Sequence, residues 1–208
     1  MQCSRIGTAT SLNLDIPRFK FREPRRNLPL HISRKNTERD FTIAFARAYL
    51  SQIKSIHRRT TRTQIDFARE VPMNGLGIAD FVVVSWNPNK LIDENPVSNV
   101  TEFSKTALPV IRAFELKISN WRRALMQAHR YKYFADTSIV VLPLKILKIA
   151  SNYLKTFKSI NVGLWGFDPR NNQIITLYTP RPAQPLMPKY KPRAIELVSK
   201  ASKSQHFS

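Results

Sequence analysis

Two apolar segments of this chain each contain one acidic residue, and this feature constrains the fold most. Asp80 lies in the run GIADFVVV at residues 77–84, and Glu115 lies in AFELKI at residues 113–118. An ionised carboxylate inside an apolar strand is costly unless it is paired or bound to a cation. The fold therefore has to bring each of these two carboxylates to a compensating charge.

Strand geometry places a lysine on the same face as the second acid. Side chains alternate along a strand, so Glu115 and Lys117 point to one face, about 7 Å apart along the chain, and Leu116 points to the other. If the strand that contains Asp80 is a neighbour, the two carboxylates converge near the Lys117 amine. Such a group suits a magnesium site beside a side chain that orients or deprotonates a water. The alternative is an ion pair at a sheet edge, with Asp80 as a turn residue.

The other patterns predict an α/β domain. Apolar residues at helical spacing, alternating or continuous apolar runs, and turn residues between them define the expected elements. Helices are expected at residues 37–56, 121–134 and 144–157, and strands at 63–70, 78–86, 110–118, 138–142, 161–167 and 173–178. The helix between the third and fourth strands is long enough for a right-handed parallel crossover, which predicts a mixed central sheet flanked by helices.

Basic residues are concentrated in two arms that flank this core. The chain has 34 Lys and Arg against 14 Asp and Glu, a formal net charge of +20. Residues 1–36 form a basic N-terminal arm, residues 37–179 the core, and residues 180–208 a basic tail whose proline spacing favours extended chain. So strong a positive charge attracts polyanions, which makes nucleic acid the first partner to expect and an anionic membrane surface the second.

Cysteine and hydropathy patterns limit the other classes. Cys3 is the only cysteine, which excludes an intrachain disulfide and a zinc site built from cysteines, and is compatible with a reducing compartment. The sequence has no continuous apolar run long enough for a secretory signal or a transmembrane segment, so we expect a soluble, cytoplasmic protein. The sequence leaves the oligomeric state open, a homodimer included.

The stretch from Gly77 to Pro143 resembles the PD-(D/E)XK nuclease superfamily, which has the restriction-endonuclease-like fold. The family signature is an Asp at the start of the second core strand, then Glu-x-Lys on the third strand, then a helix, within an αβββαβ core. Asp80 and Glu115-Leu116-Lys117 match it, whereas Ala79 replaces the proline of the family name. Residues 127–131, QAHRY, resemble the Gln-x-x-x-Tyr motif of the RecB-like and lambda-exonuclease-like branches.

The resemblance implies a magnesium-dependent deoxyribonuclease, for which Mn²⁺ can substitute. Asp80, Glu115 and the backbone carbonyl of Leu116 would be metal ligands, and Lys117 would position or activate the attacking water. In many family members the first helix supplies a further acid, here Glu38, although an acid near a helix N-terminus is also an ordinary stabilising residue. Glu70 at the end of the first strand could line the same site, and its role stays open.

The helix after the Glu-x-Lys strand offers candidate contacts to nucleic acid. Gln127 and Tyr131 are four residues apart and share a helix face, on which Arg123 lies one turn earlier. We expect Gln127 and Tyr131 to hold the Lys117 amine or a substrate phosphate, and Arg123 and Arg130 to contact phosphate. The alternatives are that Tyr131 packs under the sheet and that the polar residues form a solvated face.

Two other functions remain open at this level. The first is a noncatalytic nucleic-acid-binding protein that keeps the nuclease fold, because the superfamily contains such members. The second is a basic architectural or membrane-surface protein, for which residues 144–158 are a mild candidate because they place four lysines around an apolar pattern. Retention of Asp80, Glu115 and Lys117 together favours the nuclease.

The arms carry more than half of the net charge, which makes their role testable. Deleting residues 1–30 and 190–208 should weaken DNA binding and reduce the slope of log affinity against log salt concentration, because fewer counterions are released. Binding titrations at several NaCl concentrations measure this slope. An unaltered slope would show that the arms do not contact phosphate.

Overall fold

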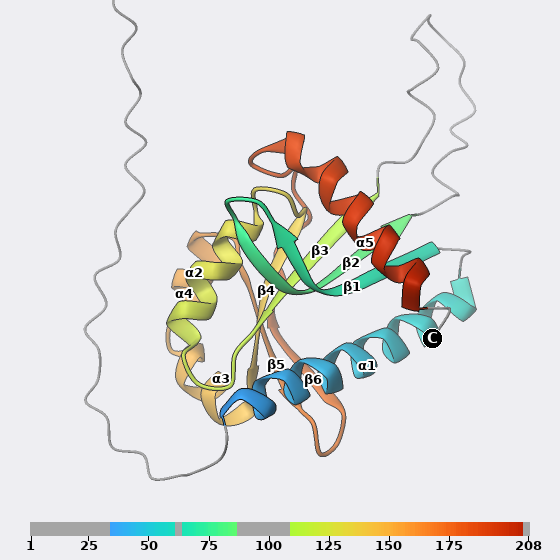
Figure 1. The fold of residues 1–208 in the computed structure, drawn as a ribbon. Helices are drawn as coiled ribbons and strands as arrows, with labels where there is room; N and C mark the ends of the chain where they lie inside the picture. Colours follow the sequence, from blue (N-terminus) through green and yellow to red (C-terminus); the bar gives the residue numbers. More distant parts are fainter. Residues whose placement is uncertain (1–33, 61–63, 87–108, 206–208) are drawn as a thin grey trace, which may run out of the picture. The chain divides into compact units, whose positions relative to one another are not determined.

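Six strands form one mixed sheet whose spatial order is the order of the chain, β1-β2-β3-β4-β5-β6 (Figure 1). The computed structural model describes residues 34–60, 64–86 and 109–205. The strands are β1 (Gln64–Met73), β2 (Gly77–Trp86), β3 (Val110–Leu116), β4 (Thr137–Pro143), β5 (Gly163–Asp168) and β6 (Gln173–Tyr178). The helices are α1 (Arg34–Thr60), α2 (Trp121–Tyr131), α3 (Leu144–Ser151), α4 (Leu154–Ser159), the 3₁₀ helix η3 (Pro188–Tyr190) and α5 (Lys191–Gln205).

The strand directions follow from the connections. The pairs β1–β2, β2–β3 and β5–β6 are antiparallel, whereas β3–β4 and β4–β5 are parallel. Parallel neighbours need a crossover, which α2 supplies between β3 and β4, and α3 with α4 between β4 and β5. The prediction of an α/β domain with a mixed sheet flanked by helices is thus confirmed.

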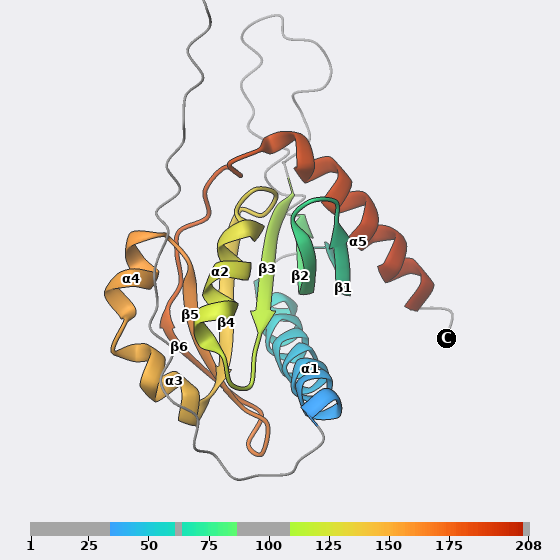
Figure 2. The ribbon, with the colours of Figure 1, turned by 60° about the vertical axis from the view of Figure 1, so that its left-hand side comes forward.

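One face of the sheet is covered by α1. Phe41, Phe45 and Tyr49 recur every four residues along this helix and are at most 6% exposed. They pack on aromatic residues of the central strands, with the Phe45 and Phe114 ring centroids 5.3 Å apart. Figure 2 shows α1 on this side of the sheet. Because this aromatic stripe is buried, the part of α1 from Phe41 to Tyr49 is held against the sheet.

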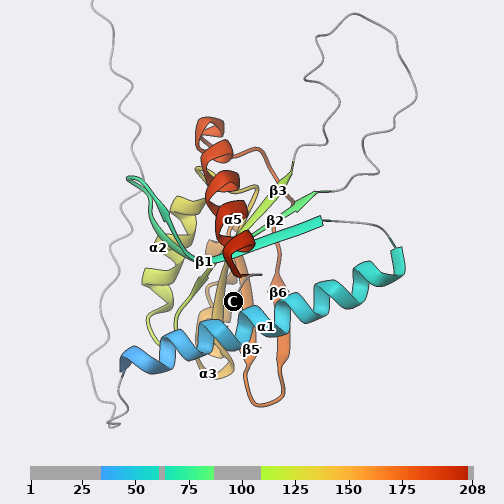
Figure 3. The same ribbon diagram turned by 45° about the vertical axis from the view of Figure 1, so that its right-hand side comes forward.

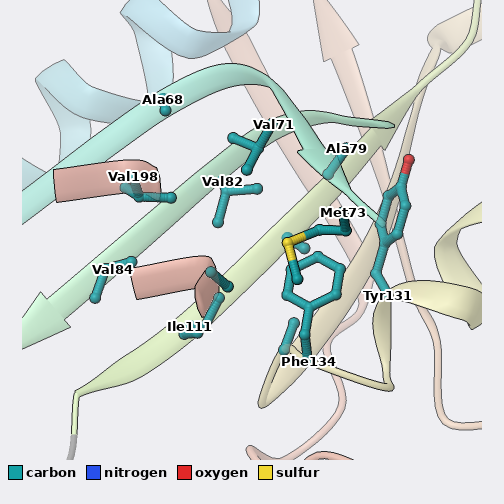
Figure 4. Packing of buried hydrophobic residues seen from close by; sticks show 13 residues of the cluster. Ala68, Val71, Met73, Ala79, Val82, Val84, Ile111, Tyr131, Phe134 and Val198 are labelled. Carbon is teal, nitrogen blue, oxygen red and sulfur yellow. The ribbon is translucent and has the colours of Figure 1, made fainter. Parts of the chain in front are cut away.

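The opposite face is covered by α2, α3, α4 and α5. Helix α2 begins after Asn120, whose side-chain Oδ1 accepts a hydrogen bond from the Arg123 amide and so caps the helix. The end of α2 supplies Tyr131, which packs among buried residues of β1, β2 and β3 together with Phe134 just beyond the helix (Figure 4). Two helices replace the single helix expected over residues 144–157, because the chain turns between Ser151 and Leu154.

The C-terminal residues are not the extended tail that the proline spacing predicts. Lys191–Gln205 is helix α5, which lies across β1 and β2 (Figure 3) and belongs to the same compact unit as the sheet. Ala194 and Val198 of α5 are fully buried. Pro188 and Pro192 fit because each lies in the first turn of a helix, where the amide that proline lacks has no intrahelical partner.

An ion pair fastens the start of α5. Lys191 Nζ lies 2.7 Å from Asp136 Oδ1, and the other oxygen of Asp136 accepts a 2.7 Å hydrogen bond from the Ile111 amide. The domain therefore extends beyond residue 179. Because removing residues 190–208 would remove part of its core, only the deletion of residues 1–30 tests an arm for phosphate contact.

The predicted N-terminal arm lies outside the described residues up to residue 33. Residues 87–108, between the second and third predicted strands, also lie outside them. Within the described part of the chain, none of the helices combines the length and hydropathy needed to span a bilayer.

Weakening the contact of α5 with the sheet should destabilise the domain. We expect Val198→Ala, which removes two methyl groups from a buried site, to lower the free energy of unfolding by about 1–2 kcal/mol. Lys203→Ala, at an exposed position of the same helix, should change it by less than about 0.5 kcal/mol. Urea unfolding measures both values, and equal stability of the two variants would contradict the packing of α5.

Candidate active site

The acidic residues meet where the ladder between β2 and β3 ends. These strands pair from Ser85 and Val110 to Phe81 and Phe114. At the next position, the Leu116 amide donates a 2.8 Å hydrogen bond to the Asp80 side chain. The end of the ladder thus places the carboxylate of Asp80 beside the strand that contains Glu115.

A break in strand alternation turns Asp80 toward α1. Ala79 and Val82 of β2 both pack in the cluster under α5, although a regular strand would send residues three apart to opposite faces. The same break occurs opposite, between Ala68 and Val71 of β1. Glu70 lies inside this break with a φ of 54°, a left-handed conformation that is uncommon for residues other than glycine.

Lys117 lies at the centre of three carboxylates. Its Nζ contacts the Glu38 carboxylate and is 3.2 Å from Glu115 Oε1 and 3.9 Å from Asp80 Oδ2. The three acids come from α1, β3 and β2, so the group unites both sides of the sheet. The prediction that Glu115 and Lys117 share a face agrees with their ion pair.

The three acids determine the charge state of this lysine. Burial by itself would lower the pKa of Lys117, but Glu115, Glu38 and Asp80 together raise it above its ordinary value. Lys117 is therefore an ammonium in this arrangement, and it can donate hydrogen bonds but cannot accept a proton.

Glu115 is fully buried and contacts Tyr131. The Tyr131 hydroxyl touches Glu115 Oε2 and also lies 2.8 Å from the Ile78 carbonyl oxygen. The Tyr131 hydroxyl has one proton, so it donates to either Glu115 Oε2 or the Ile78 carbonyl oxygen at any one time. Burial, together with the nearby Asp80 carboxylate, raises the pKa of Glu115 to about 7.

Asp80 is also shifted in the direction of the neutral form. Burial raises its pKa, and the Glu38 and Glu70 carboxylates add to this effect, while Lys117 and the Leu116 amide oppose it. Clustered acids with raised pKa values are a common property of functional sites. This property makes the group around Lys117 a candidate functional site.

The donor set fits a hard divalent cation. Mg²⁺ prefers carboxylate and carbonyl oxygens, and a cationic ammonium already lies between Glu38, Asp80 and Glu115. Glu115 Oε1 has an ion-pair partner but no aligned hydrogen bond among the described residues. In the side-chain positions of the described residues, no three His, Cys, Asp or Glu residues are arranged so that they could hold a metal ion.

The four residues of α2 that the sequence predicts to contact nucleic acid differ in their exposure to solvent. Arg123 and Arg130 are exposed, whereas Tyr131 is only 2% exposed. In this arrangement Tyr131 is not accessible for direct contact with nucleic acid, because its hydroxyl lies in the core against Glu115 and the Ile78 carbonyl. Gln127 is half-buried, and its Oε1 has no hydrogen-bond partner among the described residues. The three carboxylates, rather than Gln127, hold the Lys117 amine.

A small hollow that no sequence pattern predicts lies beside the acids. It has a volume of about 180 Å³ and is lined by Glu38, Arg39, Thr42, Arg69, Glu70 and Asp80. The helical spacing of Glu38 and Thr42 indicates that these two residues share a side of α1. No comparable signal exists for Arg69 and Glu70, because adjacent strand residues are expected on opposite faces.

Comparisons of the chain with protein-family models, with curated proteins and with solved structures give no match.

Replacing Glu115 by glutamine tests its buried charge. Because the folded state raises the pKa of this carboxyl from 4.5 to about 7, its contribution to stability is complete below pH 4.5 and is lost as the pH rises through about 7. Glu115→Gln removes this titration. We expect the variant and the wild type to have the same Tm at pH 4.5, where the wild-type carboxyl is protonated. Above pH 7 the variant should have the higher Tm.

Thermal unfolding in EDTA at the two ends of the range measures the difference. Glu196→Gln is the control, because the Glu196 carboxylate lies on the exposed side of α5. A Tm difference for Glu115→Gln that does not change with pH would contradict the raised pKa.

Proposed function

We propose that this protein is a magnesium-dependent deoxyribonuclease with a restriction-endonuclease-like core. The observation that carries the proposal is the convergence of Glu38, Asp80 and Glu115 around Lys117 at the end of the β2–β3 ladder. The element order supports it, because α1, β1–β3, α2 and β4 follow the αβββαβ order of the superfamily, with β3 and β4 parallel.

The acids would hold the cation. Asp80 and Glu115 supply carboxylate oxygens, with Glu38 and the Leu116 carbonyl as further candidate ligands. When bound, Mg²⁺ supplies charge stabilisation for the transition state of phosphodiester hydrolysis and lowers the pKa of a coordinated water. Glu115 must be ionised to bind the cation. The Tyr131 hydroxyl would keep the Glu115 carboxylate oriented by donating its proton to Oε2.

Lys117 would act on the water and the phosphate. Its ammonium can donate hydrogen bonds to the attacking water and to a non-bridging phosphate oxygen. Once a cation neutralises the three acids, the pKa of Lys117 loses the support that now raises it. The lysine is thus better suited to deprotonating a water in the loaded site than in the arrangement seen here.

The charge distribution supports a polyanionic substrate. The net charge of +20 attracts nucleic acid, and Arg123 and Arg130 lie exposed on α2, the helix that also supplies Tyr131. Contacts of this kind hold the phosphate backbone and contribute affinity rather than sequence recognition.

A second candidate is a nucleic-acid-binding protein that keeps this fold but does not cut. One observation favours it, namely that Lys117 already neutralises the acids from within the group. Calorimetry with Mn²⁺ separates the two functions, because a nuclease must bind the cation and a purely binding protein need not. Incubation of circular and linear DNA with Mg²⁺, Mn²⁺ or EDTA then tests cleavage directly.

Substitutions in the acidic group should abolish cleavage but not binding. We expect Glu115→Ala and Lys117→Ala each to reduce Mg²⁺-dependent cleavage by at least about a hundredfold, since each removes a group that acts on the reacting atoms. DNA affinity should change little because most basic residues lie elsewhere. Single-turnover cleavage and fluorescence anisotropy measure the two effects.

A matched control is available on α5. Glu196 and Lys200 form an exposed ion pair of the same chemistry, and Glu196→Ala and Lys200→Ala should leave the rate unchanged. Wild-type cleavage by either Glu115→Ala or Lys117→Ala would refute the proposed chemistry.

A further inference from the structure

We propose that the hollow beside the acids is a seat for one phosphate group of the substrate strand, held by Arg39 and Arg69. This inference rests on the proposed function, because it assigns the substrate contact nearest to the candidate metal site. Neither arginine is part of the signature from which the metal site is inferred, and their roles come from the geometry of the hollow.

The dimensions of the hollow favour a small group. Its volume of about 180 Å³ is below the roughly 300–1,000 Å³ of pockets that enclose drug-sized ligands. It can take a phosphate with a few waters, but not a base together with its sugar. The hollow therefore suits the backbone of a strand whose bases lie outside it.

Both arginines are available for an anion. Within the described part of the chain, neither Arg39 nor Arg69 forms an ion pair, although three carboxylates line the same hollow. A guanidinium presents several N–H donors in one plane, a geometry that matches two oxygens of a phosphate. Two such groups on one small hollow make a phosphate the best-fitting occupant.

The strand backbone is distorted at this point. Arg69 and Glu70 are adjacent in β1 and yet line the same hollow, which regular alternation would prevent. The left-handed conformation of Glu70 permits it. Uncommon conformations of this kind cluster at functional sites because they cost stability and persist where the surrounding structure holds them.

The location couples the seat to the cation. Asp80 and Glu38 line the hollow and also contact or approach Lys117. With Glu70 they place three acids around two arginines, so an anion is repelled until a divalent cation neutralises the carboxylates. Binding of phosphate in the hollow should therefore depend on the cation, and by linkage the phosphate should strengthen binding of the cation.

Arginine substitutions test the seat. Arg39→Gln and Arg69→Gln remove the charge, Arg69→Lys keeps the charge without the planar fork, and Arg47→Gln is the control. Arg47 is an exposed arginine of the same helix that lines a groove with Asn171 and Asn172 rather than the hollow. Affinity for a short DNA duplex is measured at several NaCl concentrations, in Ca²⁺ and in EDTA, and single-turnover cleavage is measured in Mg²⁺.

In Ca²⁺, each glutamine variant should reduce the slope of log affinity against log salt by roughly one, the value for one lost phosphate contact. In EDTA the slopes should equal that of the wild type. Cleavage should fall by on the order of ten- to a hundredfold, since a misplaced phosphate costs rate. Arg69→Lys should restore the slope but only part of the rate, and Arg47→Gln should resemble the wild type throughout.

The outcomes separate the seat from the proposed function. If the wild type does not cleave DNA but the glutamine variants lose slope in Ca²⁺, the seat stands and the nuclease proposal fails. If the wild type cleaves and both variants keep its slope and rate, the seat is refuted while the nuclease proposal stands. Should Arg69→Gln unfold, the exposed Arg39 decides alone, because its substitution removes no buried contact.

Discussion

The arrangement of this domain depends on one buried carboxylate. Glu115 is fully buried in the central sheet, where a charge is tolerated only with a partner. Lys117, directly after β3, supplies the opposite charge. Tyr131, at the end of α2, supplies a hydrogen bond. Because the pKa of Glu115 is raised to about 7, the fold holds this group at the boundary between its neutral and ionised forms. Burying this carboxylate costs stability, and the cation binding that we propose for Glu115 would account for that cost.

The helices on the two faces of the sheet supply different residues to this site. Helix α1 is held by aromatic packing on one face and brings Glu38 to Lys117, while α2 packs on the other face and brings Tyr131 to Glu115. The end of the β2–β3 ladder is the place where groups from both faces meet. A displacement of either helix would change the surroundings of the same lysine and carboxylate. The aromatic packing that holds α1 on the sheet therefore also holds Glu38 beside Lys117.

Most of the fold could be predicted from local patterns, and the exceptions have clear causes. Alternation and helical spacing located the six strands, α1 and α2 because a half-buried element must repeat its apolar side. Helix α5 was missed because five prolines over residues 180–192 favour extended chain, although Ala194 and Val198 carry a helical apolar spacing. The pattern over residues 144–157 predicts one helix where the chain forms two, α3 and α4, because a turn between two short helices preserves nearly the same apolar pattern.

The sequence by itself determined that Asp80, Glu115 and Lys117 belong together, because acids in apolar strands require compensation and strand periodicity aligns Glu115 with Lys117. Only the tertiary structure decided which further groups reach them. The contact of Glu38 depends on how α1 packs, and the burial of Tyr131 on how α2 ends against β2. The hollow with Arg39 and Arg69 depends on one left-handed backbone angle at Glu70, which interrupts the period of the strand. Residue spacing reports the regular part of a structure, whereas these contacts arise where packing overrides that regularity.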